Sequence, residues 1–222
     1  MNDSFAGRVS AIGCLDDPVR RSVYEAVTRH PDGVDRSTLA DELGLARSTA
    51  AFHLERLVAE GLIAAFAKRV GLRTGPGSGR PTKLYRRSEM ETSVSVPDRH
   101  YDLAADLMAR AIERTAQSGD EIRGALQAVA REAGVEKGRE AGSLARVLEQ
   151  NGYEPGDDGD GGFALHNCPF HRLAREHTTT VCALNVGFLT GARDGAGADE
   201  YAIAPAVAGA PCCAHIRRST AQ

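Results

Sequence analysis

The sequence predicts an α+β protein with two domains, an N-terminal winged helix-turn-helix and a C-terminal α+β domain in which helices precede a small antiparallel sheet. Three observations support this prediction. Apolar residues recur at helical spacing in the first third of the chain, two short strand-like segments then flank a Gly-rich loop, and four of the five cysteines lie between residues 168 and 213. A chain of 222 residues favours two modest cores over one large core.

The composition indicates a globular protein. Hydrophobic residues make up 42% and charged residues 26% of the chain, which excludes collagen-like, coiled-coil and wholly disordered classes. No apolar run reaches the roughly 18 residues of a membrane helix. The first residues, MNDSFAGRVS, lack the order of a secretory signal. We therefore expect a cytoplasmic protein that makes no membrane contact.

The charge is unevenly distributed, although the formal net charge is only −3. The segment from Gly61 to Ser88 contains no Asp or Glu and seven basic residues, Lys68, Arg69, Arg73, Arg80, Lys83, Arg86 and Arg87. A local positive patch attracts phosphate whatever the total charge is. A nucleic acid is therefore the expected partner of this segment.

The first 88 residues have the order of elements found in a winged helix-turn-helix. A helix is followed by the breaker His30–Gly33, and Ser37 is the candidate cap of the next, short helix. Gly44 ends that helix, and Gly61 ends the one after it. The expected helices span Leu15–Thr28, Thr38–Leu43 and Arg47–Glu60, and the expected strands of the wing span Leu62–Ala67 and Thr82–Arg86, with the loop Gly71–Pro81 between them.

The helix over Arg47–Glu60 is the candidate DNA-reading element, because the second helix of a helix-turn-helix lies in the major groove. Its expected solvent face carries short polar and basic side chains, and Arg80 and Lys83 of the wing flank Pro81, where they could reach phosphate or the minor groove. A winged helix that contacts protein, with the basic residues as solubilising charges, is the alternative. The predicted DNA contacts are Arg47, Ser48, Thr49, His53, Arg56, Arg80 and Lys83.

The string LADELGLARSTAAFHLERLVAEGLI, followed by RPTKLYR, resembles the winged-helix regulators of the bacterial ArsR/DeoR-like type over Leu15 to Arg87. The resemblance implies a double-stranded DNA partner. Two residues depart from the pattern. Ala46 stands where a capping Ser or Thr is common, and Phe52 occupies an outward position that is usually polar.

Residues 89–97 are the expected linker, and residues 98–222 the expected dimerisation and sensor domain. Two helical regions begin this domain, and the Gly- and Asp-rich segment Asn151–Gly162 is expected to be a turn. A short helix fits between Cys168 and Cys182. The expected helical regions span Tyr101–Ala116 and Asp120–Gln150, and the expected strands span Phe163–His166, Glu200–Ile203 and Cys212–Ile216.

The clustered cysteines predict metal or redox chemistry, because thiolates select zinc, copper(I) and iron–sulfur clusters. Cys168, Cys182 and the pair Cys212-Cys213 come from three segments that could converge on one cofactor, and the absence of a CxxC pair disfavours a zinc ribbon. The alternatives are cysteines that only fill the core, or a nucleophile at Cys168 with His171 or His177 as its base. No oxyanion-hole motif accompanies that pair, so we do not expect an enzyme. The isolated Cys14 is expected in the core.

The pattern NCPFH…VC…CC behind a winged helix resembles the SufR-like regulators of iron–sulfur cluster biogenesis. The resemblance implies a repressor with a [4Fe–4S] cluster on Cys168, Cys182 and Cys213, with Cys212 as an alternative to Cys213. Adjacent residues of a strand point to opposite faces, so only one of that pair should face the cofactor. The fourth ligand is left open between a small molecule and a histidine, with His171 and His177 as candidates beside His166 and His215.

These features together predict a homodimeric regulator that binds a near-palindromic operator and responds to its cofactor state. The helix over Tyr101–Ala116, with or without the first helix, is the expected dimer contact. Three alternatives for the sensor domain remain open at this point: a zinc site, a thiol redox switch, and a pocket for an organic effector walled by the helices from Tyr101 to Gln150.

Overall fold

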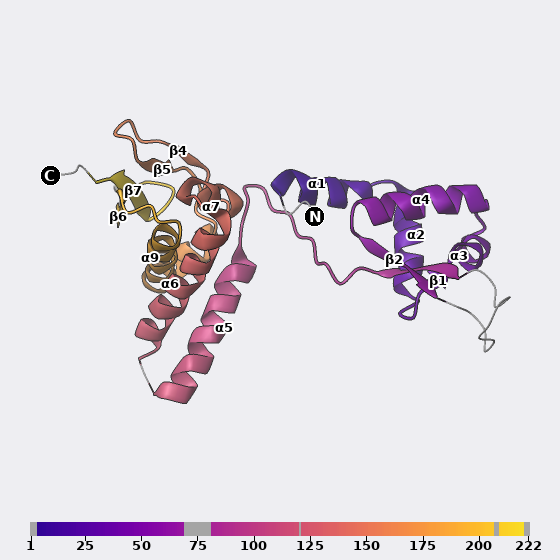
Figure 1. The fold of residues 1–222 in the computed structure, drawn as a ribbon, viewed down its shortest axis with the longest axis horizontal. Helices are drawn as coiled ribbons and strands as arrows, with labels where there is room; N and C mark the ends of the chain where they lie inside the picture. The colour runs from indigo at the N-terminus through magenta and orange to yellow at the C-terminus, as the bar shows by residue number, and fades with distance from the viewer. Residues whose placement is uncertain (1–3, 69–80, 120, 207–208, 220–222) are drawn as a thin grey trace. The chain divides into compact units, whose positions relative to one another are not determined.

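The computed structural model describes residues 4–68, 81–119, 121–206 and 209–219 and divides the chain into two compact units, Met1–Val94 and Ser95–Gln222 (Figure 1). The division falls inside the predicted linker, residues 89–97. Both units combine helices with a small antiparallel sheet, which confirms the predicted α+β class. Within the described residues, no helix is long and apolar enough to cross a membrane.

Over residues 4–68 and 81–94, the first unit packs four helices against a three-stranded antiparallel sheet of order β1-β3-β2. The register pairs Ala65 with Tyr85 and Phe66 with Leu84, as expected of a wing hairpin. Two elements were not predicted, the helix α1 and the short strand β1. The elements are α1 (Phe5–Cys14), α2 (Pro18–Thr28), β1 (Val34–Asp35), α3 (Arg36–Leu43), α4 (Arg47–Ala59), β2 (Ile63–Lys68) and β3 (Thr82–Arg87).

Side-chain caps fix where the helices of the first unit begin. Asp17 accepts a hydrogen bond from the Arg20 backbone N–H, and Pro18 occupies the first turn of α2, where its missing N–H costs nothing. The predicted cap of α3, Ser37, is wrong. Asp35 is the cap, because its carboxylate accepts from the backbone N–H groups of both Ser37 and Thr38. Gly44, at φ +63°, ends α3 in the left-handed region that glycine tolerates best.

The described part of the second unit contains five helices and a four-stranded antiparallel sheet of order β4-β5-β7-β6. The long helix α9 was not predicted, and β4 forms where a turn was expected. The elements are α5 (Tyr101–Ser118), α6 (Ile122–Ala141), α7 (Leu144–Gln150), β4 (Pro155–Asp157), β5 (Phe163–Leu165), α8 (His171–Glu176), α9 (Thr178–Gly195), β6 (Tyr201–Pro205) and β7 (Ala214–Arg218).

Helices α6 and α9 lie side by side, and glycines form their contact (Figure 1). A β-carbon on Gly191 would lie 2.0 Å from the Arg131 carbonyl oxygen, and one on Gly134 would lie 2.1 Å from the Phe188 carbonyl oxygen. Only glycine allows the backbones to approach this closely. The contact fixes α9, which carries two side chains of the site described below.

Candidate functional site

Helix α4 carries three of the predicted DNA-reading residues, Arg47, Ser48 and Thr49, in its first turn and Arg56 in its last turn. Arg47, Ser48 and Arg56 are exposed, and Thr49 is half-buried. Ala46 provides no side-chain cap, so the first N–H groups of α4 lack a side-chain acceptor from that position. Phe52 is 65% exposed on the same helix. This surface has the polar and basic side chains that major-groove contacts need.

The prediction that His53 faces solvent is wrong. His53 is 6% exposed, and its Nδ1 has no hydrogen-bond partner among the described residues. The reason is helical periodicity, since residues 50, 53, 54 and 57 form one i, i+3, i+4, i+7 stripe and all four are buried. The His53 ring instead meets Phe52 edge to face, with 5.2 Å between the ring centroids. Its position is that of a core residue.

The wing strand β3 is bonded to the reading helix through Glu55 of α4. The Lys83 Nζ lies 2.6 Å from Glu55 Oε1, and the Tyr85 hydroxyl donates to the same oxygen across 2.9 Å. The hydrogen bond from Lys83 lowers the pKa of the Glu55 carboxyl below its ordinary value, and the same bond raises the pKa of Lys83. Lys83 is therefore paired within the protein. Arg80 lies outside the described residues.

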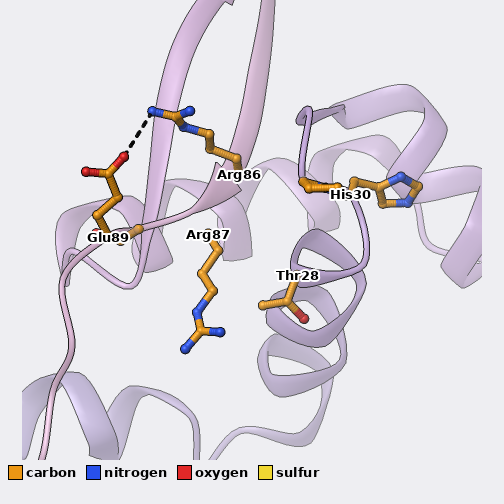
Figure 2. A pocket seen from close by; sticks show the side chains of 7 residues that line it. Thr28, His30, Arg86, Arg87 and Glu89 are labelled. Carbon is orange, nitrogen blue, oxygen red and sulfur yellow. Dashed lines mark ion pairs between the residues drawn. The ribbon is translucent and has the colours of Figure 1, made fainter.

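A pocket in the first unit lies between the residues that follow α2 and the end of β3. Figure 2 shows Arg86 pointing towards Glu89, to which it is ion-paired across 3.8 Å, and Arg87 extending to the other side. No residue of α4 lines this pocket, so it is separate from the reading surface. The lining residues are Thr28, His30, Pro31, Arg86, Arg87, Ser88 and Glu89.

Residues 15–64 match a family model described as a helix-turn-helix domain. This segment runs from before α2 into β2, so it contains the α3–turn–α4 pair. The protein is a DNA-binding transcriptional regulator. The exposed polar face of α4 and the β2–β3 hairpin that follows the matched segment agree with a winged helix-turn-helix. No curated protein and no solved structure matches the chain.

Four cysteine side chains of the second unit interact with one another, and we call them the thiol site. Cys168 follows β5, Cys182 lies on α9, and Cys212 and Cys213 precede β7. Cys168 and Cys212 are buried, whereas Cys182 and Cys213 are half-buried. The three segments that the sequence singled out therefore meet in one core. Cys14 is buried in the first unit, as predicted.

The thiols interact in a row that runs from Cys182 through Cys213 and Cys212 to Cys168. The pKa of Cys168 is lowered, first by the hydrogen bond from Cys212, while the pKa of Cys212 is raised to about 11, first by that same bond. Burial and the bond to Cys213 raise the pKa of Cys182 to about 12. The bond to Cys212 and burial raise the pKa of Cys213 as well. Cys168, at the accepting end of the row, is the thiol that ionises most readily.

Asn185, one turn after Cys182 on α9, joins the row to the core. Its Nδ2 lies 3.4 Å from Cys212 Sγ and 3.5 Å from Cys213 Sγ, and its Oδ1 accepts from the Tyr153 hydroxyl across 2.6 Å. Tyr153 is fully buried, and its pKa is well above the ordinary value because burial and the nearby thiols disfavour its anion. Sequence reasoning missed both residues. Their side chains meet only because the turn after α7 packs against α9.

One expectation about the site needs correction. Cys212 and Cys213 are not on a strand, because β7 begins at Ala214. The rule that only one of them can face the site therefore does not apply, and both sulfurs lie near Asn185 Nδ2. The candidate histidines differ from the buried thiols in their exposure or in their hydrogen-bond partner. His166, His171 and His177 are exposed, and His215 Nε2 is 3.0 Å from the Asp158 carboxylate.

The thiol site has the donor type of a soft-metal or iron–sulfur centre, since every interacting side chain in the row is a cysteine. The thiols contact one another in this structure. In the part of the chain that the structure describes, no group of three or more His, Cys, Asp and Glu side chains is arranged around a metal position. The chemistry of the donors therefore fits such a group, and the present arrangement is that of free thiols.

Proposed function

We propose that the second unit is a sensor and that the state of its thiol site sets the affinity of the first unit for DNA. The observation that carries this proposal is that four thiols from three separate segments interact with one another, two of them beside the buried Asn185 amide. Cysteines that serve only as core filling have no need of such a hydrogen-bonded row. A buried site cannot touch DNA itself, so its state must act through the fold.

The cofactor that we propose for this site is an iron–sulfur cluster, [4Fe–4S], bound by Cys168, Cys182 and Cys213, with Cys212 as the alternative to Cys213. Such a group supplies sensitivity to oxidants and to iron supply. The three cysteines would bind the cluster as thiolates. The Asn185 amide lies within hydrogen-bond distance of the sulfurs of Cys212 and Cys213, and hydrogen bonds of this kind commonly tune thiolate ligands. His171 and His177 are the candidate fourth ligands.

A thiol redox switch without metal is the second candidate, and the row of thiols favours it. The pKa of Cys168 is lowered by the hydrogen bond from Cys212, so the thiol of the row that ionises most readily lies beside a second thiol. Oxidation of such a pair removes two electrons and two protons and joins the two sulfurs. Under either candidate the role is regulatory and not catalytic. The burial of Cys168 beside exposed His171 and His177 supports this view.

We further propose that the protein acts as a homodimeric repressor on a near-palindromic operator. Two copies of α4 related by a twofold axis would meet successive major grooves of such a site. Helix α5 is the proposed contact between the copies. It carries the apolar side chain of Ile112, which is 62% exposed in the single chain.

The test is to purify the full chain without oxygen, record its absorption spectrum, and measure its iron and sulfide. A duplex selected by the wild-type protein from a random library then serves as the operator, and its affinity is measured before and after oxidation with ferricyanide. We expect bands near 400 nm, loss of iron in Cys168→Ser, and a change in affinity of about tenfold or more. Cys14→Ser is the matched control. A colourless, iron-free protein whose affinity still responds would select the thiol switch, and unchanged affinity would overturn the proposal.

A further inference from the structure

Asp98, Arg99 and His100 lie between residues 89–97 and α5, and we call these three residues the linker end. This segment is hydrogen-bonded to the residues that surround Cys168. Arg99 Nη1 donates to the Cys168 carbonyl oxygen across 2.6 Å, and the His100 N–H donates to the Pro169 carbonyl oxygen across 3.2 Å. The end of the linker is therefore bound to the backbone of a thiol-site residue.

Asn167, next to Cys168, completes this contact. Its side chain is 5% exposed. Its Nδ2 donates to the Asp98 carbonyl oxygen across 2.9 Å and to the Gly152 carbonyl oxygen across 2.6 Å, while its Oδ1 accepts a hydrogen bond from Arg99. One buried amide thus holds the linker end and the turn after α7 together. We call the contact of residues 98–100 with residues 167–169 the junction.

The same loop also contacts the start of α5. The Arg172 backbone N–H donates to the Tyr101 hydroxyl across 3.4 Å, and the Arg172 guanidinium lies 6.0 Å from the centre of the Tyr101 ring. Tyr101 is the first residue of α5, the helix proposed for dimerisation. The loop from Asn167 to Arg172 therefore holds both the linker end and the N-terminus of α5.

We propose that the junction carries the state of the thiol site to the DNA-binding unit, with Asn167 and Arg99 as its positioning residues. This inference rests on the proposed function above. Coupling between two sites requires an element whose bonding differs between two states. Cys168 lies between Asn167 and Pro169, so a change in the bonding of its sulfur that shifts this backbone alters the hydrogen bonds to Asp98, Arg99 and His100. The linker is the covalent path from those residues to the first unit.

Cys168 is buried at 4% exposure, so a change at its sulfur acts through the residues packed around it. The hydrogen bond from Arg99 reaches the carbonyl of Cys168 itself, without an intermediate residue. Because these hydrogen bonds are made to the backbone, they change with any movement of the loop, whether a cluster is lost or thiols are oxidised. The junction therefore serves either chemistry of the site.

The test measures a response ratio, defined as the operator affinity of the anaerobically purified full chain divided by its affinity after ferricyanide treatment, which attacks clusters and thiols alike. Arg99→Met removes two hydrogen bonds of the junction and keeps the length of the side chain. We expect a ratio of about ten or more, in either direction, for the wild type and a ratio within about twofold of one for Arg99→Met. Arg175→Met, the same change at an exposed position of α8, should keep the wild-type ratio.

Hydrogen exchange of the His100 amide gives a second readout that a general loss of stability would not reproduce. In the wild type we expect its exchange to speed up on ferricyanide treatment, because the amide is bonded to Pro169. In Arg99→Met the amide should exchange at a rate that no longer depends on the treatment. Asn167→Ala, if it folds, should lose the response in the same way.

The outcomes separate this inference from the proposed function. If Arg99→Met and Asn167→Ala both keep the wild-type ratio, the junction is not the route and the inference is overturned, while the sensing function stands. If the wild-type ratio is one, the proposed function fails first and the inference fails with it. A variant that loses the response but still takes up iron or still oxidises its thiols would support the junction.

Discussion

The two units place their functional polar groups in opposite environments. In the DNA-binding unit these groups lie on the surface, where Arg47 and Ser48 are exposed and Lys83 forms an ion pair with an exposed Glu55. In the second unit the side chains of Tyr153 and Asn185 are buried with the thiols. A surface that reads a long polymer must face solvent, whereas the site that we propose for sensing lies in a core, where each hydrogen bond has a defined partner.

This difference has an energetic consequence. Surface ion pairs contribute little to stability, typically about 0–1 kcal/mol each. A buried polar group that loses its partner costs about 1–3 kcal/mol. Substitutions at the DNA-binding surface should therefore change affinity with little effect on folding. Substitutions around the thiol site should change folding as well as sensing, and the predictions below test this contrast.

The largest expected effect is the loss of stability in Gly191→Ala. The added methyl group would meet the Arg131 carbonyl oxygen at 2.0 Å, so α6 and α9 must separate. We expect a loss of about 2–3 kcal/mol from the second unit, measured by denaturant unfolding with hydrogen exchange to assign the unit. Gly124→Ala, on the open side of α6, is the control and should be neutral or stabilising. Equal stability of the two variants would show that the glycine contact is dispensable.

The next effect tests the buried hydrogen bond. Tyr153→Phe keeps the ring that stacks with Phe188, with 6.5 Å between the centroids, but leaves Asn185 Oδ1 without its donor. We expect a loss of about 1–2 kcal/mol in unfolding free energy. Tyr201→Phe, in a half-buried ring packed on Phe163, should change stability by less than about 0.5 kcal/mol. An equal loss of unfolding free energy in both variants would mean that the loss comes from the surroundings of the ring and not from the hydrogen bond.

The same contrast explains what the sequence could predict. The α3–turn–α4 pair and the wing follow from local periodicity and turn residues, so they were found with small errors at their ends. His53 was misassigned because its polar character was weighed above its place in the stripe of residues 50, 53, 54 and 57. Asp35 was overlooked as a cap because β1 ends and α3 begins within two residues.

The second unit was harder because its contacts are not local. Helix α9 opens with three threonines and contains glycines at 187, 191 and 195, all poor helix formers. Packing against α6 outweighs that propensity, and no single-sequence pattern shows it. The cysteines were found by residue type alone. Tyr153 and Asn185 carry no such signal, since Tyr153 is 32 positions from Asn185, and Asn185 is 27 and 28 positions from Cys212 and Cys213.

A smaller effect is expected at the cap of α3. The Thr38 hydroxyl is the main cause that lowers the pKa of Asp35, so the folded state favours the ionised carboxylate. Asp35→Ala should therefore cost about 1 kcal/mol at pH 7. Because the pKa is lower in the folded state, this difference should be complete above the unfolded pKa of about 3.9 and should shrink as the pH falls below it.

The measurement for the cap is urea unfolding of both proteins between pH 3 and pH 7. Asp35→Asn is the control, because asparagine caps helices without a titrating group. It should keep most of the stability at pH 7 and lose the pH dependence. A difference between wild type and Asp35→Ala that stays constant down to pH 3 would show that the ionised carboxylate is not the stabilising form.

The smallest effect concerns the DNA-binding surface itself. Glu55→Gln keeps an acceptor for the Tyr85 hydroxyl but removes the charge that holds Lys83. We expect operator affinity to rise about two- to fivefold, because the surface pair is weak and Lys83 becomes available to phosphate. The slope of log affinity against log salt should steepen by about one. Folding stability should change by less than about 0.5 kcal/mol, as expected of an exposed pair.

Glu42→Gln is the matched control. Glu42 lies on α3 and is ion-paired with Arg29 and His30, not with a residue of the wing. It should leave the salt slope unchanged. If Glu55→Gln leaves affinity and slope as they are in the wild type, Lys83 does not reach phosphate and its pairing with Glu55 serves the fold of the wing. In that case the polar contact of β3 would be structural, like those of the second unit. The contrast between the two units would then rest on α4 alone.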